Sequence, residues 1–175
     1  TMRGYAAAVN VETVRWGMFR IVIRPGAFTK TLSESNVRGL WNHNDDYVLS
    51  STKSGTLSLF EDAKGLGFEM QVNPVGINAT FVDNVKRGIV EGMSIGFDAV
   101  KEQWTRGDGG MDLMGILEAK LSEISPCTFP QFEESTSVEV VEFAKSIHAR
   151  GQAGKSTTPP LEPDQAASEP QQHSD

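Results

Sequence analysis

Short segments in which apolar and polar residues alternate constrain the fold of this chain most. Alternation with a period of two puts one face of a β-strand on a core. Residues 56–60 alternate in this way, and so do residues 66–72. The polar run 61–65 between them is typical of a turn, so the two segments predict a β-hairpin. Further strands are predicted at residues 9–14, 19–23, 37–41, 47–51, 93–100, 111–117 and 118–127.

Helical patterns are fewer. One or two helical turns are predicted at residues 28–34. A longer helix is predicted from Asn78, a good N-cap, to Gly92, which is placed to end it. The apolar face of this helix would carry Phe81, Val82, Val85 and Ile89. A last helix is predicted at residues 137–149, because Thr136 and Glu139 have capping-box spacing.

Many short strands with two or three helices predict a mainly β fold with flanking helices, an α+β barrel or sandwich with the helices outside. The 175 residues fit one domain with a tail. Residues 1–150 form the predicted domain. Residues 151–175 are acidic, hold four of the eight prolines and lack aromatic residues, so we expect a disordered tail.

Composition excludes several classes of function. The net charge of −7 argues against binding to nucleic acids or anionic membranes, which requires a basic surface. The single cysteine excludes an internal disulfide and a cysteine-based zinc site. No apolar run approaches the ~20 residues that span a membrane. We therefore expect a soluble, intracellular protein without a cofactor or a bound metal.

Only three histidines are available for acid–base chemistry. His173 lies in the predicted tail, where nothing would hold it. His148 lies near the predicted end of the last helix, where a histidine is favourable to the helix dipole and needs no other role. His43 follows an apolar run and sits among amides and carboxylates, so it is the candidate base, although a histidine in a surface turn would look the same.

Two further segments supply partners for such a base. In residues 91–97, small residues surround Ser94 and leave room for a carbonyl group, although a helix end followed by a core strand has the same pattern. In residues 121–125, a strand would put Glu123 on one face with Leu121 and Ser125, although an exposed polar face is also compatible. A serine needs an adjacent base, and the base needs a third group to orient it. His43, Ser94 and Glu123 offer one candidate for each part.

Five landmarks in this order resemble the tailed-phage prohead proteases, the capsid maturation proteases. They are Arg3–Ala6 with Ile23–Phe28, the Trp41–Asn44 segment, Lys64–Glu69, Gly88–Glu91 with Met93–Phe97, and Leu121–Ser125. Asn44 departs from the aspartate that is commoner beside the family's histidine, and residues 126–130 depart from its usual apolar continuation.

The resemblance implies Ser94 as nucleophile, His43 as base and then acid, and Glu123 as the orienting carboxylate, with Asp45 as the runner-up. It also implies a small closed or partly closed β-barrel ringed by helices, like that of the herpesvirus assemblin proteases. Gly96 and the neighbouring backbone are candidates for an oxyanion site.

The resemblance also implies a biological role. The substrates would be scaffold and major capsid proteins, cut in the host cytoplasm inside an assembling prohead, with self-cleavage as a further activity. An extended substrate would pair with a strand edge. Assemblin relatives act as dimers, which admits a homodimer or a higher oligomer.

Two other functions stay open at this stage. A non-catalytic assembly module that kept the fold would not bring Ser94, His43 and Glu123 together. A metal-dependent hydrolase would use His43, Asp45, Asp46 and Glu123, a set that suits a hard ion.

Overall fold

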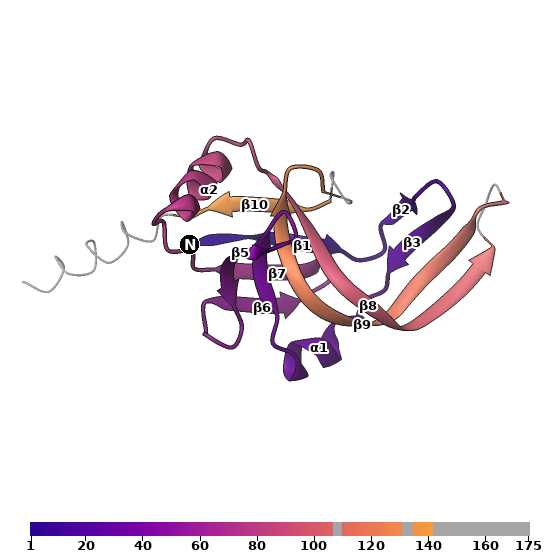
Figure 1. Ribbon diagram of the computed structural model, residues 1–175. Coiled ribbons are helices and arrows are strands. Elements are labelled where there is room, and N and C mark those ends of the chain that lie inside the picture. Colours follow the sequence, from indigo (N-terminus) through magenta and orange to yellow (C-terminus); the bar gives the residue numbers. More distant parts are fainter. Residues whose placement is uncertain (107–109, 131–134, 142–175) are drawn as a thin grey trace, which may run out of the picture. The chain divides into compact units, whose positions relative to one another are not determined.

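The computed structural model describes residues 1–106, 110–130 and 135–141 (Figure 1). Within these residues, two helices, α1 (Thr29–Glu34) and α2 (Ile77–Lys86), accompany ten strands. The strands are β1 (Met2–Ala8), β2 (Glu12–Arg15), β3 (Phe19–Ile23), β4 (Arg38–Trp41), β5 (Asn44–Ser51), β6 (Leu57–Glu61), β7 (Gly65–Met70), β8 (Gly92–Arg106), β9 (Asp112–Cys127) and β10 (Ser137–Val140). The predicted mainly β fold is confirmed. None of the helices in the described residues is long and apolar enough to cross a membrane.

The strands pair into two sheets. The first has the order β10-β1-β7-β6, with all neighbours antiparallel. The second has the order β2-β3-β9-β4-β5, and β8 pairs with the other side of β9. One cluster of buried apolar side chains draws on both sheets and on α2. Its largest fully buried members include Phe28, Phe68, Phe81, Leu66 and Ile124.

The long antiparallel pair of β8 and β9 is the main scaffold of the second sheet, and Figure 1 shows it as a bent ribbon. Parallel partners occupy only part of the other side of β9. β3 pairs with residues 113–116 and β4 with residues 123–124. The backbone between these two stretches therefore needs other hydrogen-bond partners.

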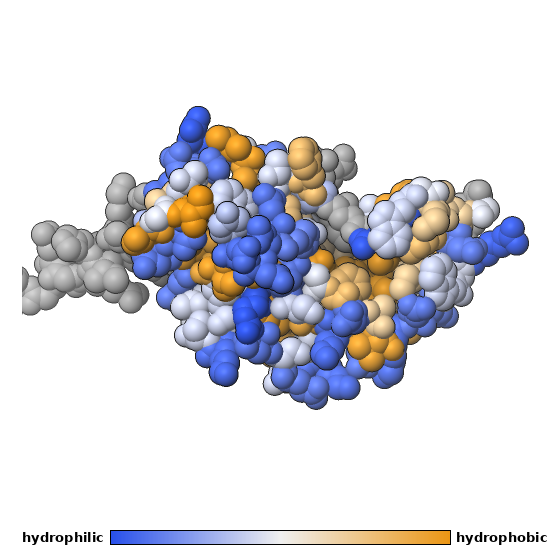
Figure 2. All heavy atoms as spheres, in the orientation of Figure 1, coloured by the Kyte–Doolittle hydropathy of each residue, from blue (hydrophilic) through white to orange (hydrophobic). Residues whose placement is uncertain are grey.

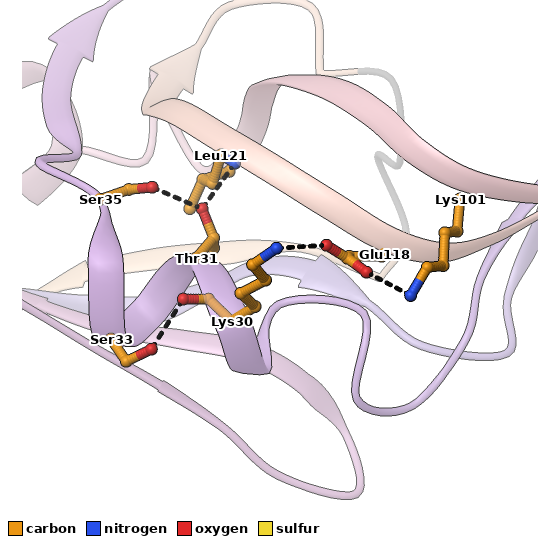
Figure 3. Close-up of polar contacts among 7 residues, drawn as sticks. All are labelled: Lys30, Thr31, Ser33, Ser35, Lys101, Glu118 and Leu121. Atoms are coloured by element: carbon orange, nitrogen blue, oxygen red, sulfur yellow. Dashed lines mark hydrogen bonds and ion pairs between the residues drawn. The ribbon is translucent and has the colours of Figure 1, made fainter.

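Helix α1 and the turn before it supply those partners. The Ala119 N–H donates to the Ala27 carbonyl at 2.8 Å, and the Leu121 N–H donates to Thr31 Oγ1 at 2.9 Å. The Glu118 carboxylate forms ion pairs with Lys30 and Lys101, and the hydrogen bonds from these two lysines lower the pKa of its carboxyl (Figure 3). The predicted helical turn at residues 28–34 is thus confirmed, and it bonds the side of β9 opposite β8 between the stretches that pair with β3 and β4.

The predicted last helix is wrong over its first turn, because residues 137–140 form strand β10. β10 pairs with β1, and the Val138 N–H donates to the Glu91 carbonyl. The Thr136 hydroxyl accepts the Met93 N–H at 3.0 Å and so bonds a strand rather than a helix start. Tertiary pairing has overridden the local capping pattern. The rest of that helix, including His148, and the predicted tail lie outside the described residues.

The second predicted helix exists, but it both begins and ends earlier than predicted. α2 begins at Ile77 rather than after Asn78, and no side chain caps it. Gly88, with φ +68°, follows the C-cap Arg87 and provides the left-handed residue expected from Gly92. Phe81 and Val85 are buried as predicted, but Ile89 lies beyond the helix and is exposed.

Several strand boundaries also differ from the prediction. Residues 9–11 leave the sheet between β1 and β2, with Asn10 in a left-handed conformation. The segment 101–106, expected in a loop, continues β8, and β9 runs unbroken through both predicted strands. Among the described residues the strands form two sheets, and no closed barrel is found. The barrel and its likeness to the herpesvirus proteases therefore remain a prediction.

Candidate active site

The turn that carries His43 is a two-residue hairpin between β4 and β5. Trp41 pairs with Asn44, which leaves Asn42 and His43 as the central residues. Both have positive φ, 54° and 58°, as a type I′ turn requires. Asparagine and histidine visit this left-handed region more readily than most residues, at a cost that surrounding contacts must offset.

Those contacts come from the end of β9. The Asn42 N–H donates to the Pro126 carbonyl at 3.1 Å, and the Thr128 N–H donates to Asn42 Oδ1 at 2.9 Å. The His43 N–H donates to Ser125 Oγ at 3.1 Å. The turn is therefore fixed by residues 125, 126 and 128, at and just past the end of a strand that lies more than 80 residues away in the sequence.

The side chains of His43 and Glu123 are in direct contact. His43 Nδ1 lies 2.6 Å from Glu123 Oε1, as an ion pair or a hydrogen bond according to protonation. A carboxylate accepts but does not donate, so neutral His43 carries its proton on Nδ1. This leaves Nε2 with a lone pair, which is the state a general base needs. The other carboxylate oxygen, Oε2, accepts the Ser125 hydroxyl at 2.5 Å.

Gly96 makes room for this carboxylate. It lies opposite Glu123 in the β8–β9 register, and a Cβ at Gly96 would come within 2.4 Å of Glu123 Oε1. That separation is not tolerated without moving the carboxylate. The side chain of any other residue at this position would therefore displace the group that bonds His43.

Ser94 pairs with Ser125 across the two strands. Directly paired residues share a face of the sheet, with Cβ atoms roughly 5 Å apart. Ser94 therefore lies on the face that carries Glu123 and its partners, and it is 8% exposed. No hydrogen bond joins Ser94 Oγ to His43 in the described part of the chain. Such bonds are often long or unformed in free enzymes.

Cys127, the single cysteine, is an unsuitable nucleophile. Burial, with a smaller contribution from the negative charge of Glu123, raises the pKa of its thiol to about 12. The group is therefore protonated at neutral pH, and a thiol reacts as its thiolate.

Asp45 and Asp46 are exposed on β5, whereas Glu123 makes the contact with His43. Among the described side chains, no three acidic, histidine or cysteine groups gather where they could hold a metal ion.

Two hollows border this region. A cleft of about 810 Å³ is lined in part by Gly92, Cys127, Thr128 and Thr136, at the start of β8 and just past the end of β9. A second groove, of about 330 Å³, is lined mainly by apolar residues. These are Arg15, Trp16, Phe19, Ile21, Ile95, Gly96, Phe97, Ala99, Met114 and Ile116. Apolar side chains are visible over this part of β8, β9 and the β2–β3 hairpin in Figure 2.

The structure thus brings two of the three predicted side chains into contact and places the third on the same face. Sequence reasoning missed Ser125 as a partner of both Glu123 and His43. The alternating pattern had put Ser125 and Glu123 on one face, which was the available signal. It also missed Asn42, whose bonds to Thr128 depend on a contact that no local pattern encodes.

Comparisons with known proteins bear on this site. The model of the caudovirus prohead serine protease family matches residues 1–150. A curated relative, the prohead protease of Enterobacteria phage HK97, is 35% identical over an alignment of 134 positions that covers 72% of this chain. The chain spans 57% of that relative's length. No solved structure matches the chain. The family match covers His43, Ser94 and Glu123 together, and the chain belongs to the caudovirus prohead serine protease family.

Proposed function

We propose that this chain is a serine endopeptidase with Ser94 as nucleophile, His43 as base and then acid, and Glu123 as the orienting carboxylate. The observation that carries the proposal is the 2.6 Å contact between His43 Nδ1 and Glu123 Oε1, on the face of β8 and β9 that also carries Ser94. Membership of a serine protease family supports the same chemistry.

The reaction follows from these positions. Ser94 Oγ forms a bond to the scissile carbonyl carbon while His43 Nε2 takes the hydroxyl proton. Glu123 stabilises the positive charge that develops on the imidazole. The protonated His43 then donates to the leaving amine, which departs and leaves an acyl group on Ser94. A water molecule, deprotonated by His43, releases the acyl group as a carboxylic acid and restores the serine.

The outer edge of β8 is suited to bind an extended peptide. The Met93 N–H bonds the Thr136 hydroxyl rather than β9, and the Pro126 carbonyl bonds Asn42 on the far side of β9. Met93 and Pro126 are therefore a non-hydrogen-bonded pair. Main-chain polar groups alternate sides along a strand, so those of Ile95 point to the outer edge, next to Ser94. A peptide paired there would pass the apolar groove that Ile95 and Phe97 help to line.

Family membership suggests what such a peptide would belong to. We propose that the substrates are scaffold protein or the scaffold-like arm of a capsid protein, and the chain itself. Cleavage would take place inside the assembling prohead in the host, and the active form would be a homodimer or a higher oligomer. A non-catalytic assembly module is the less favoured alternative, because it gives no reason for His43 to contact a carboxylate.

The decisive experiment is Ser94→Ala, co-produced with a capsid protein that carries its scaffold arm. We expect cleavage to be abolished while the fold is retained, because the alanine removes only the nucleophilic oxygen. Electrophoresis and mass spectrometry of the capsid protein report cleavage, and circular dichroism reports the fold. Ser122→Ala, at an exposed serine of β9, is the matched control and is expected to cleave normally. Wild-type cleavage by Ser94→Ala would refute the assignment.

A covalent probe identifies the nucleophile directly. A fluorophosphonate, which reacts with activated serines, is expected to label Ser94, and peptide mapping gives the position. Label on another serine would identify that serine, rather than Ser94, as the nucleophile. Activity that is lost with a chelator and restored by a divalent ion would instead favour the metal-dependent hydrolase.

A further inference from the structure

We infer that Ser125 is a positioning residue that couples Glu123 to His43, so that the site works as four residues rather than three. This inference rests on the proposed function. It assigns to Ser125 a role in the rate of the chemical step rather than in the folding of β9.

The Ser125 hydroxyl holds both neighbours at once. It donates its proton to Glu123 Oε2 at 2.5 Å, and its oxygen accepts the His43 main-chain N–H at 3.1 Å. A hydroxyl has one proton to donate and two lone pairs to accept with, so the two bonds are compatible. The carboxylate that orients the His43 ring and the backbone that carries this ring are therefore fixed to the same atom.

The carboxylate depends on this arrangement. Each of its oxygens has its own partner, the Ser125 hydroxyl at Oε2 and the His43 ring at Oε1. Gly96 leaves the space that Oε1 occupies. Without the donor at Oε2, only the bond to the His43 ring would oppose rotation of the carboxylate, and Oε1 would leave the ring nitrogen for part of the time. The ring would then lose the tautomer that keeps Nε2 free as a base.

Ser125 is not itself a candidate nucleophile. It is 0% exposed, and its proton is already committed to a carboxylate. Ser94, its directly paired neighbour on β8, is the more accessible of the two serines. The two serines therefore have different roles: Ser94 would react with the substrate, and Ser125 bonds both Glu123 and the His43 main chain.

The test uses the full chain and two substitutions of Ser125. Ser125→Ala removes the hydroxyl, and Ser125→Cys keeps nearly the same volume but replaces a strong donor by a weak one. Rates are measured on a fluorogenic peptide that spans a mapped cleavage site. Fluorophosphonate labelling counts the active molecules, so that kcat is expressed per competent site. Ser122→Ala, on the same strand but exposed, is the control.

We expect both substitutions to lower kcat per labelled site by about 10- to 100-fold with KM nearly unchanged, the loss typical of an outer hydrogen-bond partner at a functional site. A structural role predicts otherwise. Ser125→Cys would then keep the wild-type kcat because it fills the same space, and Ser125→Ala would lower only the labelled fraction or the melting temperature. Either of these results overturns the inference. Retained cleavage by Ser94→Ala, measured in parallel, would overturn the proposed function itself.

Discussion

Two hairpin turns of this molecule differ in where the hydrogen-bond partners that hold them come from. In the turn between β6 and β7, Asp62 Oδ1 accepts the N–H groups of Lys64 and Gly65 at 2.8 and 3.1 Å. These partners lie two and three residues away in the sequence. In the turn between β4 and β5, the partners of Asn42 and His43 are residues 125, 126 and 128, from the end of β9.

The difference separates a turn that joins strands from a turn that presents a reactive group. The β6–β7 turn supplies the acceptor for its own Lys64 and Gly65 N–H groups, and contacts from Tyr5 and Val9 add to it. The β4–β5 turn holds two non-glycine residues at positive φ and depends on the same segment of β9 that carries Glu123. Coupling the turn to β9 fixes the position of the His43 ring relative to its carboxylate. Preorganisation of this kind is what a functional site requires.

The largest contrast between the turns is expected from His43→Ala and Lys64→Ala. Loss of the candidate base is expected to lower kcat by about 10⁴-fold or more, in line with the loss of a triad histidine. Lys64→Ala removes a contact with the Tyr5 ring and is expected to leave kcat unchanged. Cleavage rates on the fluorogenic peptide measure both effects. A His43→Ala chain that retains a tenth of the wild-type kcat would show that this turn is structural as well.

Asn42→Ala tests whether the anchoring of the turn matters. The substitution removes the side-chain bond to the Thr128 N–H and the readiness of asparagine to adopt positive φ. We expect the free energy of unfolding to fall by about 1–2 kcal/mol, and kcat to fall by about tenfold, as small misplacements of a catalytic group do. Urea denaturation and peptide cleavage measure the two losses.

Asn42→Gly separates the two contributions. Glycine accepts positive φ without strain but cannot bond Thr128. We expect it to recover part of the stability and little of the rate. If Asn42→Gly instead matches the wild-type rate, the bond to Thr128 plays no part in positioning His43.

The same contrast explains which features could be predicted from the sequence. The β6–β7 hairpin follows from its alternating strands and local turn residues, and the structure agrees. The face shared by Glu123 and Ser125 follows from strand periodicity. Strand β10 does not, because its partner β1 lies at the other end of the described chain and the local pattern favours a helix.

The contacts within the site could not be predicted from the sequence, because they depend on long-range strand pairing. His43 and Glu123 are 80 residues apart, and only the parallel pairing of β4 with β9 brings the turn to the carboxylate. The space that Gly96 leaves for Glu123 comes from another pairing, the antiparallel register of β8 and β9. Residue types gave the candidates for each role, but register decided which groups touch.

The smallest effect is expected from Tyr5→Phe, which removes a bond from β1 to the β6–β7 turn. The Tyr5 hydroxyl donates to Asp62 Oδ2 at 2.7 Å, and this bond is the largest of the contacts that hold the pKa of the Asp62 carboxyl below its usual range. A carboxyl with a lowered pKa in the folded state adds stability above its unfolded pKa and loses it as the pH falls through the folded value. The free energy of unfolding of the wild type should therefore slightly exceed that of Tyr5→Phe at neutral pH, and the gap should close once the pH is low enough to protonate Asp62 in the folded wild type. Urea denaturation at both pH values measures the gap, and the Asp62 carboxyl resonance should titrate at a higher pH in the variant. Since no bond of this turn reaches β9, kcat should stay at the wild-type value. A fall in kcat would mean that the two turns are coupled and that the separation drawn between them is wrong.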